Sequence, residues 1–413
     1  MSYSPAVVDN LLPRPDWVRR INDMAPGVGG AAALVSLDPE EIVAAAVAAT
    51  GLDDFGEPTW EEPFRRLVTS IDEEARCHVV GRLMCRHDLI RHLGTRLQIV
   101  DAHRRDPALA TTPVPAPIFI TGPARSGTSI LQELVALDPG LRGPLGYEMA
   151  FPLPPAGTDD ATRRAWAECE FDLWADVHPG FAAVHSLEAG LPEECLWLLA
   201  PEFDMGFWTT NVNVPAFVAW RAFSDPMPAY RMHRQFVQVL QAGDPTSWIF
   251  KSPIHMSRLP TLLAVYPDAR ILRTHRDPVK TMASSVSTLV HGRWTRSDHV
   301  DPREVGAMSG MGLTMMLNAA ASPDAALPPG QIAEVQYLDL MRDPGATVTA
   351  ALETLGVTPD PSLPDRIRAY LAARPQGHKG VHRYSLAEYG LDADAIRRDL
   401  APYIETFGVV AEA

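Results

Sequence analysis

The sequence predicts an α/β fold: a parallel sheet flanked by helices and preceded by an N-terminal helical region. Four short apolar runs, at 117–121, 247–250, 269–274 and 331–335, are expected to be strands. Stretches of helical spacing separate or follow them, at 129–137, 256–266 and 346–355. Strands that alternate with helices are typical of a parallel sheet covered on both faces. Ligands of such sheets bind beyond the carboxyl ends of the strands, so we expect the functional residues there.

The pattern along the chain predicts two regions. Residues 1–110 form an N-terminal helical region packed on the core, with one helix over 37–50 and two more within 60–105. Residues 111–413 form the α/β domain. Within it, the segment of about 153–243 combines many aromatic residues with irregular Pro and Gly and is expected to be a helical insertion. Its aromatic residues fit ordinary core or the wall of a site for an apolar molecule, and the sequence leaves both open.

Composition excludes several classes of function. The 413 residues are 46% hydrophobic and carry a formal net charge of −15, which disfavours binding to nucleic acid or to anionic membranes. No window reaches the roughly 18 uninterrupted apolar residues of a membrane span, and the N-terminus lacks the apolar core of a signal peptide. The four cysteines form no CxxC pair and no zinc-like cluster. We therefore expect a cytoplasmic protein without a metal, whose positive charge is concentrated locally if it binds an anion.

A phosphate-binding loop is predicted between the first strand and the helix that follows it. The residues are Gly122-Pro123-Ala124-Arg125-Ser126-Gly127-Thr128-Ser129. Glycines let the backbone curl so that N–H groups point inward, and the start of the helix adds a partial positive charge. Ser126, Thr128 and Ser129 supply hydroxyl groups, and Arg125 supplies a flat guanidinium suited to phosphate or sulfate oxygens. A plain glycine turn needs neither the hydroxyls nor the arginine.

The loop has Walker A spacing with one difference, because Thr128 stands where Walker A requires lysine. In this it resembles the sulfotransferase family, whose P-loop-like segment has Lys or Arg before Ser-Gly-Thr-Thr/Ser. The resemblance implies that Arg125, Ser126, Gly127, Thr128 and Ser129 hold the 5′-phosphosulfate of 3′-phosphoadenosine 5′-phosphosulfate (PAPS).

A second segment is similar to the same family. Arg276 follows the strand 269–274, and Ser284 lies eight residues later on a predicted helix. In the family an Arg and a Ser at this spacing bind the 3′-phosphate of the cofactor. Asp277-Pro278 is also an ordinary helix start, which leaves Arg276 unexplained. The resemblance runs from about 117 to 384 and is to the bacterial branch related to tyrosylprotein sulfotransferases.

A basic stretch near the C-terminus also resembles the family. Many members close the site with an Arg-Lys-Gly loop that contacts the 3′-phosphate, and His378-Lys379-Gly380 is similar to it. Lys379 and Gly380 are therefore candidate cofactor-binding residues, and an exposed basic turn is the alternative.

Sulfuryl transfer needs a cation for the leaving phosphate and a base for the acceptor's proton. Lys251 ends a predicted strand and matches the strand-end lysine of the family. In many members the base is a His two residues later, but Pro253 stands there, so His255 is the nearest imidazole. Glu148 is the rival, since the tyrosylprotein branch uses a Glu after the loop helix. Glu193, Glu194 and His185 are weaker candidates.

The sequence thus predicts an enzyme that transfers the sulfuryl group of PAPS to a hydroxyl or amine of a small, apolar acceptor. One alternative is a P-loop nucleotide kinase or phosphotransferase, which Thr128 in place of lysine disfavours. Another is a nucleotide-binding protein without catalysis on the same fold. The identity of the acceptor, the choice of base and the oligomeric state stay open.

Overall fold

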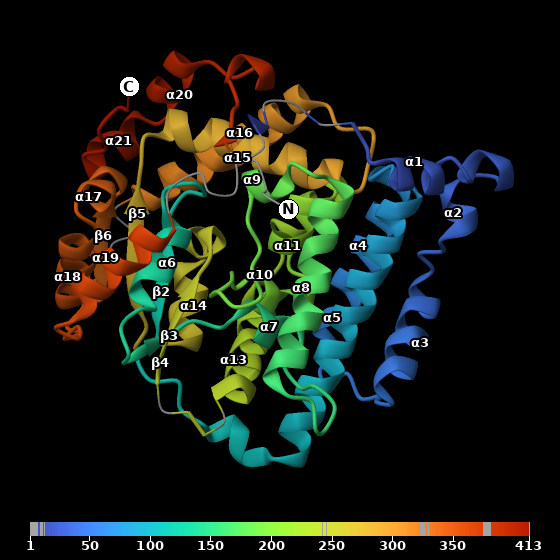
Figure 1. The fold of residues 1–413 in the computed structure, drawn as a ribbon, viewed down its shortest axis with the longest axis horizontal. Coiled ribbons are helices and arrows are strands. Elements are labelled where there is room, and N and C mark those ends of the chain that lie inside the picture. The colour runs from blue at the N-terminus through green and yellow to red at the C-terminus, as the bar shows by residue number, and fades with distance from the viewer. Residues whose placement is uncertain are drawn as a thin grey trace.

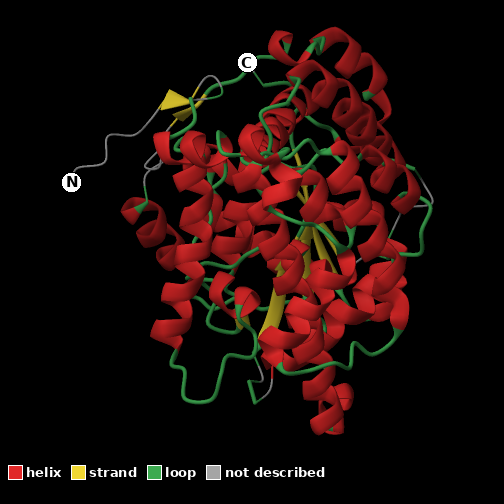
Figure 2. Cartoon of the chain, turned by 90° about the vertical axis from the view of Figure 1, so that its right-hand side faces the viewer, coloured by secondary structure: helices red, strands yellow, loops and turns green. Residues whose placement is uncertain are grey.

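The structure is a computed structural model. It describes residues 7–8, 11, 13–241, 243–244, 246–322, 327–328, 330–374 and 381–412. Helices cover both faces of the central sheet in Figures 1 and 2, and the strands of that sheet lie in the interior.

The central sheet has five parallel strands in the order β3-β4-β2-β5-β6. They are β2 (Ile118–Thr121), β3 (Leu141–Arg142), β4 (Ser247–Lys251), β5 (Arg270–His275) and β6 (Ile332–Gln336). The α/β fold and all four predicted strands are confirmed, and the two-residue β3 was not predicted. The central strand β2 lies between β4 and β5, with Phe119 opposite Phe250 and Ile271. The loops after these three strands therefore meet at one edge of the sheet.

Most of the described N-terminal region is helical. Its α-helices are α1 (Asp16–Asn22), α2 (Ala31–Leu34), α3 (Pro39–Thr50), α4 (Glu61–Glu74) and α5 (Val79–Arg105). Asp38 caps α3 by accepting the N–H groups of Glu40 and Glu41. One apolar cluster joins this region to the sheet, since it contains Phe64 and Leu93 together with Phe119 and Phe250.

The segment between β3 and β4 folds into helices. They are α7 (Gly146–Ala150), α8 (Asp160–Val177), α9 (Phe181–Val184), α10 (Leu196–Leu199), α11 (Met205–Asn211), α12 (Pro215–Arg221) and α13 (Met227–Gln241). Most of its aromatic residues are buried in the same apolar cluster, Trp208, Phe217 and Phe236 among them. The alternative that they are ordinary core is therefore the better description, although Trp166 and Phe223 are exposed.

Helix α14 (Leu259–Val265) packs beside α13 in the same apolar cluster. The remaining helices cover the other side of the sheet and the edge where its loops meet. They are α6 (Thr128–Val135), α15 (Pro278–Trp294), α16 (Pro302–Ala320), α17 (Tyr337–Arg342), α18 (Pro344–Thr354), α19 (Leu363–Ala373), α20 (Ala393–Asp399) and α21 (Ala401–Phe407). A separate two-stranded parallel ribbon pairs β1 (Val7–Val8) with β7 (Val381–His382). None of the described helices is both long and apolar enough to cross a bilayer.

Candidate active site

The predicted phosphate loop connects β2 to α6 and is pressed against neighbouring elements. Gly122 has a φ of 145°, and a Cβ atom there would lie 2.2 Å from the Thr274 hydroxyl oxygen. Gly127 has a φ of 88°, and a Cβ atom there would lie 3.0 Å from the Tyr337 ring. Both positions therefore require glycine. Arg125 also has a positive φ, 68°, which is unfavourable for a residue with a side chain.

The three hydroxyl groups of the loop have different roles. Ser126 is fully buried, and its Oγ lies 2.6 Å from the Pro123 carbonyl oxygen and 2.5 Å from the Thr274 Oγ1. Its hydroxyl thus stabilises the loop itself rather than facing a ligand. Thr128 begins α6 and is buried. Ser129 is exposed, and its Oγ accepts a hydrogen bond from Lys251 at 3.1 Å.

The structure brings the two predicted cofactor segments into direct contact. The Nε of Arg125 donates to the Oγ of Ser284 at 3.0 Å. Arg276 donates from Nη1 to the Arg125 carbonyl oxygen at 2.8 Å. Residues about 150 positions apart in the chain therefore form one cationic site, because the loops after β2 and β5 leave the same edge of the sheet.

Arg125 combines two properties of a side chain that lines a concave surface. The residue is exposed to solvent, yet desolvation by the surrounding protein lowers its pKa. Among the residues that the structure describes, no carboxylate lies within salt-bridge distance of its guanidinium. A guanidinium so placed is suited to an anionic ligand.

Arg276 has partners that the sequence did not predict. Its guanidinium forms two bonds with the carboxylate of Glu412, at 2.7 and 2.9 Å. It also lies over the ring of Tyr337, 3.8 Å from the ring centre. These residues border a hollow of about 290 Å³ that Leu338 and Val410 also line. Tyr337 directly follows β6, so the rule that places ligands beyond strand ends could have found it, whereas Glu412 gives no such signal.

Lys251 ends β4 and lies beside the phosphate loop. Its Nζ donates to Ser129 and, at 2.5 Å, to the Oε1 of Glu194. The Lys251 side chain is 3% exposed and that of Glu194 is 15% exposed. Glu194 is therefore the more accessible member of the ion pair.

Two further titratable groups lie near this ion pair. Burial raises the pKa of Glu193 to about 7, although the charge of Lys251 opposes the shift. One oxygen of Glu193 accepts the backbone N–H of Glu194. Burial lowers the pKa of His185 to about 4, and the charges of Glu194, Lys251 and Arg125 also act on it. All three weaker base candidates thus lie close enough to Lys251 to interact with its charge.

The structure places His255 away from the loop. It lies in the 3-10 turn η5 (Pro253–Ser257), is fully buried, and its Nδ1 is 2.7 Å from the Tyr230 hydroxyl. Its ring meets the ring of Phe119 edge to face. Burial holds its pKa well below the ordinary value of a histidine. His255 belongs to the core beneath the sheet, so we do not retain it as the base.

Glu148 also points away from Lys251. Its carboxylate accepts the backbone N–H of Leu145 at the start of α7 and a bond from Arg142. The same Arg142 binds Asp244, which precedes β4, and stacks on Trp248 near the start of that strand. Lys251 stands at the opposite end of β4, about 10 Å from Trp248 at the usual rise per residue. Glu148 therefore stabilises α7 and is not retained as the base.

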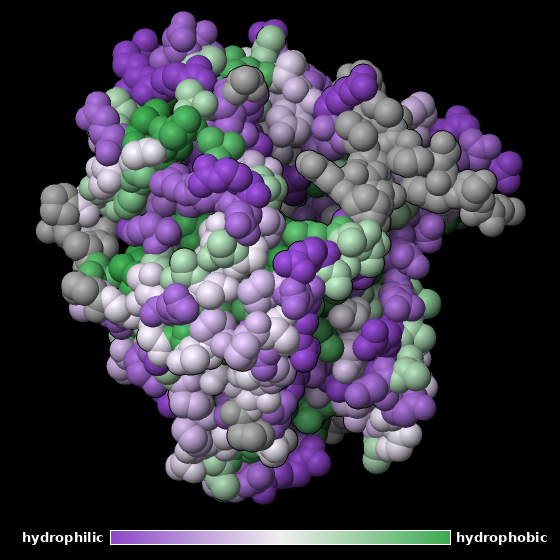
Figure 3. Space-filling model, turned by 60° about the vertical axis from the view of Figure 1, so that its left-hand side comes forward, coloured by the Kyte–Doolittle hydropathy of each residue, from purple (hydrophilic) through white to green (hydrophobic). Residues whose placement is uncertain are grey.

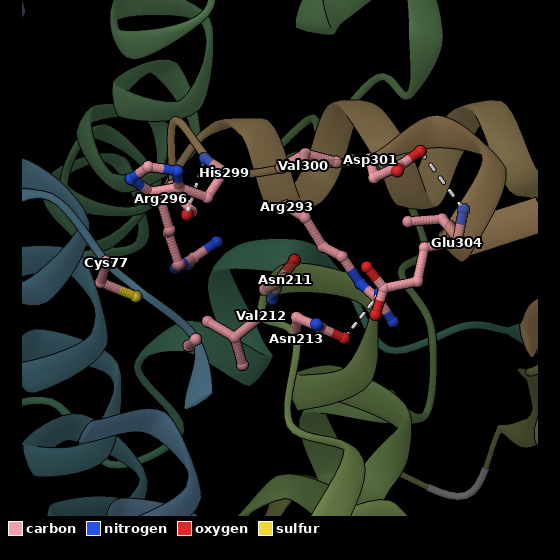
Figure 4. Close-up of a pocket in the computed structure, with 13 residues that line it drawn as sticks. Cys77, Asn211, Val212, Asn213, Arg293, Arg296, His299, Val300, Asp301 and Glu304 are labelled. Atoms are coloured by element: carbon pink, nitrogen blue, oxygen red, sulfur yellow. Dashed lines mark hydrogen bonds between the residues drawn. The ribbon is translucent and has the colours of Figure 1, made fainter. Parts of the chain in front are cut away.

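The remaining candidates, Lys379 and Gly380, fall outside the residues that the structure describes. Figure 4 shows a different pocket, between the end of α15 and the turn after α11, where Arg293 binds Asn213. None of the predicted site residues lines that pocket. Within the described part of the chain, no group of three or more His, Cys, Asp or Glu residues could hold a metal ion.

Comparisons with known proteins point to one family. Residues 117–361, which include all five strands of the central sheet, match the model of the Sulfotransferase family. The omega-hydroxy-beta-dihydromenaquinone-9 sulfotransferase Stf3 of Mycobacterium bovis is 25% identical over 280 residues, which are 62% of this chain and 66% of that protein. The match thus spans just under two thirds of the curated relative.

Two solved structures resemble nearly the whole chain. The sulfotransferase STF1 of Mycobacterium tuberculosis has a TM-score of 0.76 and 28% identity, covering 88% of this chain and 98% of its own. The sulfotransferase STF9 of Mycobacterium avium has a TM-score of 0.81 and 25% identity, covering 91% of this chain and 97% of its own. The similarity therefore includes much of the N-terminal helical region as well as the sheet.

Proposed function

Because the chain belongs to the sulfotransferase family, we propose that it transfers the sulfuryl group of PAPS to a hydroxyl group of a small, apolar acceptor. The other product is adenosine 3′,5′-bisphosphate. The observation that carries this proposal is the contact of Arg125 with both Ser284 and Arg276. It supports one nucleotide with phosphates at both ends, because the two predicted anion sites adjoin.

The residues have distinct roles in this proposal. The backbone of the loop and Arg125 hold the 5′-phosphosulfate at the start of α6. Arg276 and Ser284 bind the 3′-phosphate. Lys251 neutralises the charge that grows on the leaving phosphate as the bond from sulfur to the bridging oxygen breaks. Its bond to Ser129 places the amine at the loop.

An apolar acceptor is supported from outside the site. The similar protein Stf3 is named as acting on an omega-hydroxylated dihydromenaquinone, a lipid with a hydroxyl group. The chain is also acidic overall, with a net charge of −15, which disfavours sulfated polysaccharides as acceptors. We therefore propose a lipid-like alcohol or phenol.

A binding experiment tests the nucleotide. Ligands that bind the folded state raise the melting temperature by mass action. We expect adenosine 3′,5′-bisphosphate to raise it more than AMP does, and ATP with magnesium to have little effect. A larger shift with ATP and magnesium would favour the kinase alternative, and no shift with any nucleotide would contradict the proposal.

A turnover experiment tests the acceptor. The purified chain is incubated with PAPS and a panel of 1-dodecanol, cholesterol, 2-naphthol and a heparan disaccharide, and sulfated products are detected by mass spectrometry. We expect sulfated alcohols or phenols. Sulfation of the disaccharide alone would contradict the apolar acceptor, and nucleotide binding without any turnover would favour a protein that binds the nucleotide without catalysis.

A further inference from the structure

We infer that Glu194 is the general base that takes the acceptor's proton, and that its bond to Lys251 marks the place where transfer occurs. This deepens the proposed function and rests on it. The starting point is spatial. The amine of Lys251 contacts Ser129 of the phosphate loop on one side and Glu194 on the other. One cation therefore separates the carboxylate from the loop that holds the phosphosulfate.

The backbone around Glu194 fixes the carboxylate in this position. The N–H of Cys195 donates to the Lys251 carbonyl oxygen at 2.9 Å, and the N–H of Glu193 donates to the Pro144 carbonyl oxygen at 3.0 Å. Leu145 and Pro192 form an antiparallel bridge just before this segment. Glu194 is thus held across the end of β4 by bonds on both sides, as a catalytic group must be to act without reorganisation.

The accessibility of the two charges favours the same role. Lys251 is nearly enclosed, whereas Glu194 keeps part of its side chain open to solvent. Of the two groups, the carboxylate is therefore the more accessible to an acceptor that enters from solvent. When the phosphosulfate supplies oxygens to Lys251, the amine gains a new anionic partner and Glu194 is left free to accept a hydrogen bond from the acceptor.

The proposed step balances as follows. The acceptor oxygen forms a bond to sulfur while its O–H bond breaks, and the proton moves to the carboxylate of Glu194. The bond between sulfur and the 5′-phosphate oxygen breaks, and its electron pair leaves with the phosphate beside Lys251. The products are the sulfate ester and adenosine 3′,5′-bisphosphate, and the protonated Glu194 then returns its proton to solvent.

Two other titratable groups near Glu194, Glu193 and His185, could also accept a proton and provide matched control variants. Glu193 is more buried and uses one oxygen to accept the Glu194 backbone N–H. His185 is within the influence of the same charges but donates to or accepts from neither Lys251 nor Ser129 in the described structure. The variants Glu193→Gln and His185→Asn therefore separate Glu194 from the other proton acceptors close to it.

The experiment compares two acceptors that differ only in their need for a base. An aliphatic alcohol such as 1-dodecanol must lose its proton during transfer, whereas 4-nitrophenol is already ionised at about pH 8. For Glu194→Gln we expect sulfation of 1-dodecanol to fall by roughly 10²–10⁴-fold, the usual effect of a general base. Sulfation of 4-nitrophenol should fall by less than about tenfold. Damage to the fold would lower both rates together.

The Glu194→Gln variant is also tested for nucleotide binding, which requires no acceptor. Glu194→Gln should bind adenosine 3′,5′-bisphosphate at least as tightly as the natural chain in calorimetry, because removing the carboxylate leaves Lys251 for the ligand. Equal losses for the two acceptors, or a selective loss in Glu193→Gln or His185→Asn instead, would overturn the assignment. If the natural chain binds the nucleotide but sulfates neither acceptor, the proposed function fails, and this inference fails with it.

Discussion

The cations of the candidate site differ in what neutralises them. Arg276 is bound by Glu412 and Lys251 by Glu194, while Arg125 has the hydroxyl of Ser284 as its side-chain partner among the described residues. A charge with a carboxylate partner can be held in place before any ligand binds. A nucleotide must then compete with these carboxylates for the cations. We therefore expect substitution of either the cation or the carboxylate of each pair to change the affinity for the nucleotide.

Arg276 is expected to bind the 3′-phosphate and so to favour adenosine 3′,5′-bisphosphate over AMP. Replacing it with Gln removes a guanidinium able to form two charge-assisted bonds, each contributing about 1.5–3 kcal/mol. We expect adenosine 3′,5′-bisphosphate to bind at least about tenfold more weakly, measured by isothermal titration calorimetry. Binding of AMP, which lacks the 3′-phosphate, should change little. Equal losses for both nucleotides would show that Arg276 does not distinguish the phosphates.

Glu412 is expected to oppose nucleotide binding, because its carboxylate accepts hydrogen bonds from Nε and Nη2 of Arg276 and so occupies one edge of the guanidinium. In Glu412→Gln the competing charge is gone, and we expect adenosine 3′,5′-bisphosphate to bind several-fold more tightly, with the gain largest at low salt. The control is Glu405→Gln, which removes an exposed carboxylate from nearby α21. Unchanged affinity in Glu412→Gln, or an equal gain in the control, would contradict this role.

The proximity of Arg125, Ser284 and Arg276 could be predicted from the sequence, because residues that follow neighbouring strands meet at one edge of the sheet. Their roles in binding the cofactor stay predictions. The positions of the His255 and Glu148 side chains could not be predicted, because distance along the chain does not specify side-chain direction. A turn of 3-10 helix buries the first, and the cap of its own helix occupies the second.

At the scale of elements, the phosphate loop depends on close packing against β5. A methyl group at position 122 would overlap Thr274, and the φ of 145° is strained for any side chain. We expect Gly122→Ala to lower the unfolding free energy by about 1–3 kcal/mol and to abolish detectable nucleotide binding. Urea unfolding and calorimetry measure the two effects.

The matched control for this variant is Gly312→Ala on α16, where a Cβ atom meets nothing within 4 Å. In a helix this change should stabilise by up to about 1 kcal/mol. Nucleotide binding retained in Gly122→Ala would mean that the loop tolerates the side chain and would contradict the packing argument.

The positions of the strands could be predicted more accurately from the sequence than those of the helices that flank the sheet. Short apolar runs identified β2, β4, β5 and β6, whereas β3 has two residues and no run to detect. The predicted helix over 256–266 is divided into η5 and α14. Pro260 explains the division, because a proline fits the first turn of a helix and not its interior.

At the scale of the whole molecule, contacts between residues far apart in the chain hold the N-terminal helices against the rest of the protein, and the sequence did not predict these contacts. Arg96 on α5 and Glu202, which follows α10, form a nearly enclosed ion pair that ties the N-terminal helices to the segment between β3 and β4. Figure 3 shows a face of the molecule on which hydrophobic patches lie among hydrophilic side chains. Leu338 and Val410 are among the exposed large hydrophobic residues of the C-terminal part of the chain. The division into regions at about residue 110 stays a prediction, because one apolar cluster crosses it.

Three histidines from distant elements also meet in the folded chain. The Nε2 of His178 lies 2.7 Å from the Nδ1 of His291, and the ring of His382 meets that of His291 edge to face. Burial lowers the pKa of His178 to about 3, of His291 to about 4 and of His382 to about 3. The trio is therefore uncharged in the folded protein at neutral and mildly acidic pH.

Stability is expected to fall in acid because of this trio. An unfolded histidine binds a proton below about pH 6.5, whereas these three stay neutral to about pH 4 when folded. Between these values the unfolded state binds more protons, so the unfolding free energy decreases as pH decreases, by up to about 1.4 kcal/mol per pH unit for each group. Urea unfolding at about pH 7 and pH 5 measures the decrease. His291→Asn should make this decrease in unfolding free energy smaller, because one titrating group is lost and the charge of His291 no longer lowers the pKa of His178. The control is His299→Asn, which changes an exposed histidine and leaves the trio intact. An unchanged pH dependence in His291→Asn would mean that other groups cause the acid sensitivity.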